Sequence, residues 1–152
     1  MKKRIIFLLA TLLCTVLFAA CSITTGKSVT YAVSTGDNVE VSLTSGYDIT
    51  TDVPFTISKD DQAVFQGMFT YDGTLAAYRD GIVEAESAEL IEEGEKDGNA
   101  YIFYCVKNEY GNEYNYIVHV ADSDTEVILA SFELGEETAR AAFEATTVSS
   151  AN

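Results

Sequence analysis

The run YIFYCV at positions 101–106 is apolar at every position and consists of aromatic, β-branched and small residues. A strand of this composition is buried on both faces, which predicts a central place in a sheet. The polar turn at 108–113 leads into alternating apolar residues at 114–120, and a second turn at 121–125 leads into the apolar run 126–132. Three strands joined by two short turns predict an antiparallel meander.

Alternation with a period of two also predicts strands earlier in the chain. It marks residues 39–43, and it recurs at 53–58 and 63–69 on either side of a polar turn, as in a hairpin. Pro54 has no N–H to donate, so its strand lies at an edge of the sheet or begins there. Residues 28–34 also alternate, and they are either an extension of an N-terminal tether or an edge strand.

Two stretches change to the helical period. Leu75, Tyr78 and Ile82 share one helical face, and Thr74 before them is a residue type that caps helices. Residues 136–146 carry an apolar stripe on an otherwise polar helix. We therefore expect an α+β domain, an antiparallel β-sheet with a short middle helix and a C-terminal helix packed on it.

The order of these elements resembles the PsbP and Mog1 type of domain. The likeness rests on the short helix after the arm at 62–70, the late meander at 101–132 and the closing helix at 136–146, and it covers most of residues 38–147. The resemblance implies a non-catalytic accessory or partner-binding protein, of which many bacterial examples are small lipoproteins. It carries no motif onto which a functional residue could be mapped.

The N-terminus has the pattern of an export signal. Three cations at positions 2–4 precede an apolar run at 5–18 and the small pair Ala19-Ala20. A retained membrane-spanning helix is the alternative, but the run falls short of the roughly 20 apolar residues that a hydrocarbon core requires. We therefore expect residues 1–20 to be a signal peptide that is removed.

The end of this signal, LFAAC at positions 17–21, resembles the lipobox of bacterial lipoproteins. In that family a diacylglycerol is attached to the cysteine thiol before cleavage, which implies lipidation of Cys21 and attachment to the membrane through it. Phe18 departs from the usual pattern, which has leucine three positions before the cysteine. The alternative is ordinary cleavage after Ala20 with an incidental cysteine.

These readings divide the chain into the signal peptide, a lipidated tether at 21–37 and one domain at 38–152. Without the signal, six cations remain against 24 acidic residues, so the net charge falls from −15 to −18. Such a surface repels phosphate backbones, which argues against nucleic acid as a partner. We expect an extracytoplasmic, membrane-anchored domain that needs no cofactor.

Few residues are candidates for chemistry. Cys105 lies within the buried run and is expected to be a small core residue rather than a nucleophile, and His119 is expected on a strand surface. Asp122, Asp124 and Glu126 are spaced two apart in a turn and could offer oxygen ligands to Ca²⁺, although the glycine and the distant glutamate of a calcium loop are missing. No catalytic motif is present in the sequence.

Tyrosines are concentrated in the predicted hairpin, and Tyr110, Tyr114 and Tyr116 are candidates for a partner surface because such rings bury area and keep a polar end. Packing within the sheet is the alternative. The best hypothesis is a lipid-anchored, non-enzymatic module that binds or assembles another envelope component, with a protein partner. The alternatives are a lipoprotein that binds a peptide, a sugar or Ca²⁺, and a hydrolase that uses two carboxylates.

Overall fold

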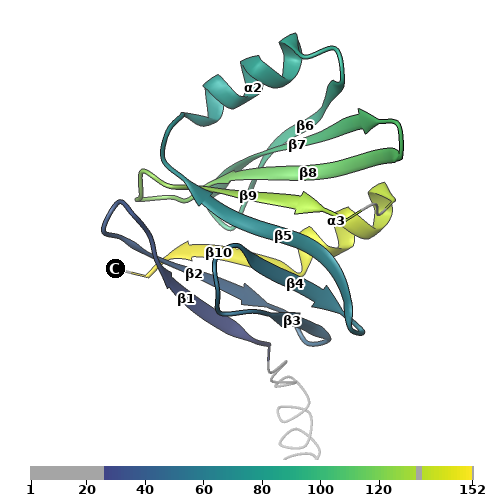
Figure 1. Ribbon diagram of the computed structural model, residues 1–152. Coiled ribbons are helices and arrows are strands. Elements are labelled where there is room, and N and C mark those ends of the chain that lie inside the picture. The colour runs from purple at the N-terminus through teal and green to yellow at the C-terminus, as the bar shows by residue number, and fades with distance from the viewer. Residues whose placement is uncertain (1–25, 133–134, 152) are drawn as a thin grey trace, which may run out of the picture.

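Ten strands and two helices form the part of the chain that the computed structural model describes, residues 26–132 and 135–151 (Figure 1). The expected signal peptide and Cys21 lie outside these residues. No helix within them is long and apolar enough to span a membrane.

The larger sheet has seven strands, and every neighbouring pair is antiparallel. In spatial order its strands are β3 (Tyr47–Ile49), β4 (Phe55–Lys59), β5 (Gln62–Thr70), β9 (Glu126–Ser131), β8 (Gly111–His119), β7 (Asn99–Asn108) and β6 (Ala88–Lys96). The predicted hairpin and meander are both present, as β4–β5 and β7–β8–β9.

The smaller sheet has three strands and was not expected. It contains β1 (Ser28–Ala32), β2 (Asn38–Leu43) and β10 (Thr146–Ser150), with β2 in the middle. Leu43 pairs with Thr146 and Val41 with Val148, so segments far apart in the sequence lie side by side. Of the two alternatives for residues 28–34, the structure shows a strand, which begins before the domain start expected at residue 38.

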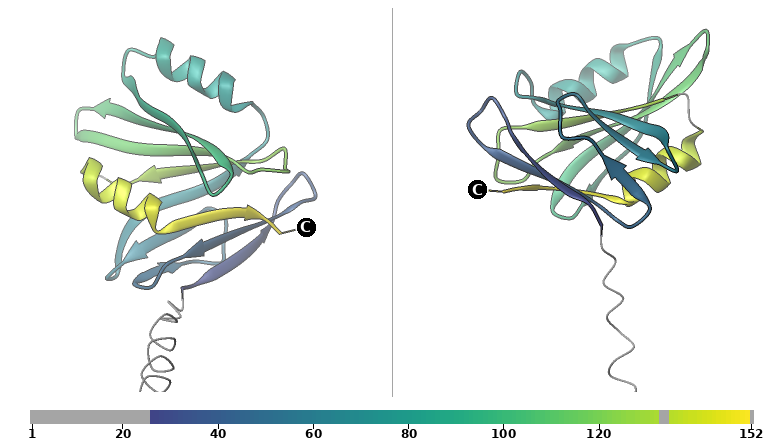
Figure 2. Two further views of the ribbon diagram at one scale, coloured as in Figure 1. Left: turned by 180° about the vertical axis from the view of Figure 1, so that it is seen from behind. Right: turned by 60° about the horizontal axis from the view of Figure 1, so that its bottom comes forward.

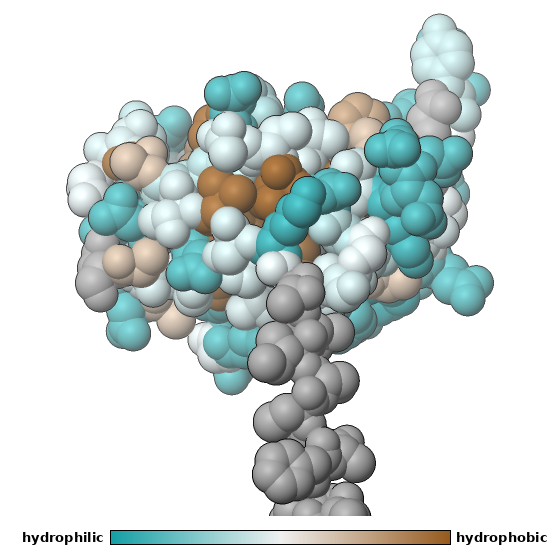
Figure 3. Space-filling view, turned by 90° about the horizontal axis from the view of Figure 1, so that it is seen from below, coloured by the Kyte–Doolittle hydropathy of each residue, from teal (hydrophilic) through white to brown (hydrophobic). Residues whose placement is uncertain are grey.

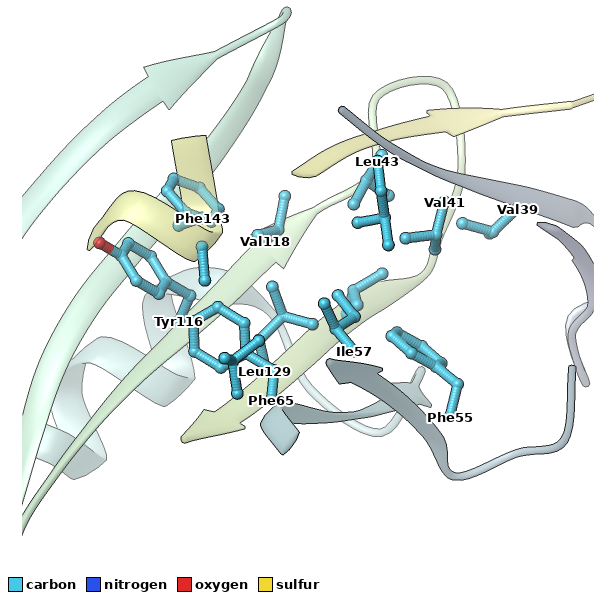
Figure 4. Packing of buried hydrophobic residues seen from close by; sticks show 14 of the residues in the cluster. Val39, Val41, Leu43, Phe55, Ile57, Phe65, Tyr116, Val118, Leu129 and Phe143 are labelled. Carbon is cyan, nitrogen blue, oxygen red and sulfur yellow. The ribbon is translucent and has the colours of Figure 1, made fainter. Parts of the chain in front are cut away.

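The core lies between the two sheets. Val39, Val41 and Leu43 on β2 are buried and point toward Phe55 and Ile57 of the larger sheet, as Figure 4 shows. The alternation along β2 places its polar residues on the outer face of the smaller sheet. Burial of aromatic and branched side chains from both sheets is the main stabilising contribution here.

The two helices cover opposite faces of the larger sheet. Helix α3 (Glu136–Glu144) packs Phe143 into the core. The helix lies beside the smaller sheet and continues into β10 (Figure 2). Helix α2 (Leu75–Glu84) places Ile82 against Ile102 and Ile117, which point to the other face. The two helical segments predicted from the sequence are therefore helices.

The expected α+β class is wrong, and so is the fold that the resemblance to the PsbP and Mog1 type implied. Residues 26–132 and 135–151 are mainly antiparallel β-structure, with 54% strand and 15% helix. The chief error concerns residues 146–150, which form β10 and complete a second sheet, whereas the sequence predicted a helix ending at residue 146 and no strand after it. Their partner strand lies at the start of the domain, and local periodicity carries no information about such a distant pairing.

The underside of the domain, seen in Figure 3, consists mostly of residues of intermediate hydropathy with hydrophilic ones among them, and a small strongly hydrophobic patch lies near its middle. Large exposed apolar areas are the usual mark of a docking surface. This face therefore offers no broad apolar area to a partner.

Candidate functional site

A groove of about 600 Å³ opens where the start of α2 lies over the ends of β7, β8 and β9. The α2 groove, as we call it, is lined by Tyr71, Gly73, Thr74, Leu75, Ala76, Ala100, His119, Asp124 and Glu126. The Thr74 side chain caps α2 by accepting a hydrogen bond of 3.2 Å from the Ala77 amide. This cap fixes where the helix begins and so fixes one wall of the groove.

Glu126 is the unusual residue of this groove, because it is a carboxylate only 3% exposed. It is the first residue of β9, where Val127 and Leu129 point into the core between the sheets. Side chains alternate along a strand, so the Glu126 side chain points to the opposite face, on which α2 lies. The carboxylate therefore projects from the sheet toward the groove that it lines.

The two oxygens of Glu126 have different surroundings. Oε1 lies 3.3 Å from Nδ1 of His119, the residue directly opposite on β8. Oε2 is buried and has no hydrogen-bond partner among the described residues. A buried acceptor without a partner costs about 1 to 3 kcal/mol, and more when it is charged, so natural proteins keep few of them.

His119 connects Glu126 to the solvent. Its side chain is 41% exposed, and it lines both the α2 groove and a second hollow of about 430 Å³ beside it. Asp124 also lines both, and Asp37 and Asp122 line the second hollow alone. None of the residues lining either hollow is a lysine or an arginine. The potential here is therefore set by carboxylates and favours cations.

The three carboxylates considered for Ca²⁺ do not share one site. Asp122 lines the second hollow, Glu126 lines the α2 groove and Asp124 lines both. Within residues 26–132 and 135–151, no group of three or more His, Cys, Asp or Glu side chains is placed to hold a metal ion. Calcium takes about six to eight oxygen ligands, and these residues supply far fewer at one point.

The three tyrosines of the proposed partner surface lie in three different environments. Tyr110 is 80% exposed at the tip of the β7–β8 hairpin, and Tyr114 is partly buried. Tyr116 is 2% exposed and stacks between Phe103 and Phe143, at centroid distances of 4.4 and 3.8 Å. The hairpin therefore presents one exposed tyrosine rather than a tyrosine surface.

Cys105 is a buried residue of β7, so the interpretation of this cysteine as a small core residue is confirmed. Burial raises the pKa of its thiol, which disfavours the reactive thiolate. It lines neither hollow of the candidate site.

Sequence reasoning named both His119 and Glu126 but did not bring them together. The signal was available in the hairpin register, because the turn between β8 and β9 places these two residues opposite one another. Tyr71 and Leu75 were missed as groove residues, since the position of α2 over the sheet depends on tertiary packing. Neither a protein-family model nor a curated protein matches this chain.

Proposed function

We propose that this chain is a lipid-anchored, extracytoplasmic binding module without catalytic activity, which takes a small ligand of the cell envelope into the α2 groove. The observation that carries the proposal is the buried Glu126 carboxylate, whose Oε2 has no hydrogen-bond partner among the described residues. A ligand that donates to this oxygen would offset the free energy that its burial costs.

The dimensions and lining of the groove support binding of a small molecule. Its volume of about 600 Å³ falls within the roughly 300 to 1,000 Å³ of small-molecule sites, which combine apolar walls with a few polar groups. Tyr71, Leu75, Ala76 and Ala100 supply apolar surface, and Glu126 supplies the buried polar group. The placement of the three tyrosines, by contrast, removes the basis for recognition through a tyrosine surface.

The proposed location at the membrane rests on the sequence around Cys21. The first strand begins at Ser28, so a short segment separates the lipidated residue from the folded domain. Two acyl chains on one residue give stable anchoring, whereas one chain gives only reversible contact. The net charge of −18 also disfavours contact of the domain itself with an anionic membrane surface.

Binding in the α2 groove is tested with a substitution that fills the groove. Ala100 is an exposed residue of β7 that lines the groove, and Ala100→Tyr adds a large side chain there without disturbing the core. We expect a fragment library screened by NMR to shift the amide signals of Ala100, His119 and Glu126 in the wild type, and to lose these shifts in Ala100→Tyr. The matched control is Gln66→Tyr, on an exposed position of β5 outside the groove, which should bind as the wild type does. A screen in which no fragment shifts the groove signals would refute the proposal.

The anchor is tested separately with Cys21→Ala. We expect the variant to appear in the soluble fraction and to take up no labelled fatty acid, while the wild type fractionates with membranes and is labelled. If the Cys21→Ala protein still fractionated with membranes and the wild type took up no label, the proposed lipid anchor would be wrong.

A further inference from the structure

We propose that the ligand of the α2 groove is a small organic cation with N–H donors, a primary ammonium or a guanidinium group, which binds the Glu126 carboxylate. This inference rests on the proposed function and specifies its ligand. It follows from the hydrogen-bonding capacity of Glu126, from the charge of the groove and from the composition of its walls.

Hydrogen bonding defines the group that meets Glu126. An ionised carboxylate only accepts, and His119 already lies at hydrogen-bonding distance from Oε1. The partner of Oε2 must therefore be a donor, which excludes a carbonyl, an ether, a carboxylate or a quaternary ammonium. Charge-assisted bonds to a carboxylate are roughly twice as strong as neutral ones, so a cationic donor is favoured over a hydroxyl.

Charge leads to the same group. The start of α2 lines the groove, and a helix N-terminus carries about half a positive charge, which by itself would favour an anion. Glu126 and Asp124 line the same groove with two carboxylates, and no lysine or arginine opposes them there. The carboxylates outweigh the helix end, so the net preference is for a cation.

The walls indicate an organic cation rather than a metal ion. The described residues offer no set of three side chains that could hold a metal, and Tyr71, Leu75 and Ala100 line the groove with apolar surface. The Tyr71 residue is 56% exposed, so its ring is accessible at the groove. An aromatic face attracts ammonium and guanidinium groups, and the apolar walls suit the carbon chain attached to them.

Calorimetric titration of the detergent-solubilised mature protein tests the inference. The probes are 1,4-diaminobutane, its neutral analogue 1,4-butanediol, and Ca²⁺. We expect saturable binding of the diamine, much weaker binding of the diol, and no tighter binding of Ca²⁺. Glu126→Gln keeps the size of the side chain and removes its charge, so it should weaken diamine binding by about tenfold or more.

Two control variants test whether diamine binding depends on the groove itself or on the overall negative charge of the protein. Asp60→Asn removes one negative charge from an exposed turn outside the groove, and it should bind the diamine as the wild type does. Ala100→Tyr should abolish binding while Glu126 remains. The inference would be overturned if Glu126→Gln bound the diamine as tightly as the wild type does, or if Asp60→Asn lost as much affinity for the diamine as Glu126→Gln. Tighter binding of the diol or of Ca²⁺ than of the diamine would also overturn it.

The two proposals fail in different ways. If the diamine does not bind but other fragments shift groove signals and lose this effect in Ala100→Tyr, the assignment of a cation is overturned and the binding function stands. If no fragment of any charge reaches the groove, both proposals are overturned.

Discussion

Tyr116 of β8 and Phe143 of α3 stack almost in parallel, with ring centroids 3.8 Å apart and an angle of 12° between the ring planes. Phe103 stacks on the other side of Tyr116 at 4.4 Å. This column of three rings joins the last helix to the middle of the larger sheet and helps to hold α3 on the core face.

Phe143→Ala should lower the free energy of unfolding by about 3 to 5 kcal/mol, because it leaves a cavity beside Tyr116 that the sheet cannot close. Urea unfolding followed by circular dichroism measures this. The control is Glu144→Ala at an exposed neighbouring position, where a change within about 0.5 kcal/mol is expected. An unchanged midpoint for Phe143→Ala would mean that α3 contributes little to the core.

Glu126→Leu should leave stability unchanged or raise it by about 1 kcal/mol or more, because it removes a buried charge with an unpartnered oxygen. The comparison is Glu92→Leu, which breaks the hydrogen bonds of Glu92 to Tyr101 and Arg140 and should be destabilising. Unfolding in urea without ligand gives both values. A strongly destabilised Glu126→Leu would show that Glu126 has a structural role, since residues kept for binding are often replaced at no cost in stability.

The pH dependence of stability should include a contribution from Glu92. Hydrogen bonds from the Tyr101 hydroxyl, and then from Arg140, lower the pKa of this carboxyl below its ordinary 4.5. Such a group stabilises the fold above the unfolded-state pKa, and the contribution is lost as the pH falls through the lowered folded-state value. Tyr101→Phe should therefore lose less stability than the wild type over this acidic range, by a small margin because Glu92 is 40% exposed. Urea unfolding at a series of pH values measures this difference, and parallel curves would contradict it.

Cys105 should react slowly with thiol reagents in the native protein, because it is 3% exposed and burial raises its pKa. Labelling followed by mass spectrometry should show its rate rising with urea in step with unfolding. Ser45→Cys, in an exposed turn, supplies a matched thiol that should react at once under native conditions. Rapid native labelling of Cys105 would place it at an accessible surface instead.

Much of the larger sheet could be predicted from the sequence, because its hairpins join strands that are neighbours in the chain. The turns at 59–62 and 108–113 and the period of two around them identify β4–β5 and β7–β8. The smaller sheet could not be predicted in this way. Val41 of β2 pairs with Val148 of β10, more than 100 positions later in the chain. A local sequence pattern does not indicate which distant strand will lie beside β2.

The candidate site was predicted in part. Asp122, Asp124 and Glu126 were named as acidic residues that could share an ion. The strand register instead pairs Glu126 with His119, and Asp122 lines the second hollow rather than the α2 groove. Burial of Glu126 was not foreseeable, since it depends on tertiary packing around the start of β9. Tyr116 was a candidate for a partner surface with packing in the sheet as the alternative, and the structure places it in the core.

The pairing of Leu43 with Thr146 bears on when the chain can fold. Strand β2 leaves the ribosome long before β10, so the smaller sheet cannot close until β10 has been made. Contacts between distant segments also form slowly, because the loop between them must first be closed. We therefore expect the chain to stay unfolded until β10 has been made, which is compatible with the proposed export. Chains truncated before Thr146 should remain sensitive to protease.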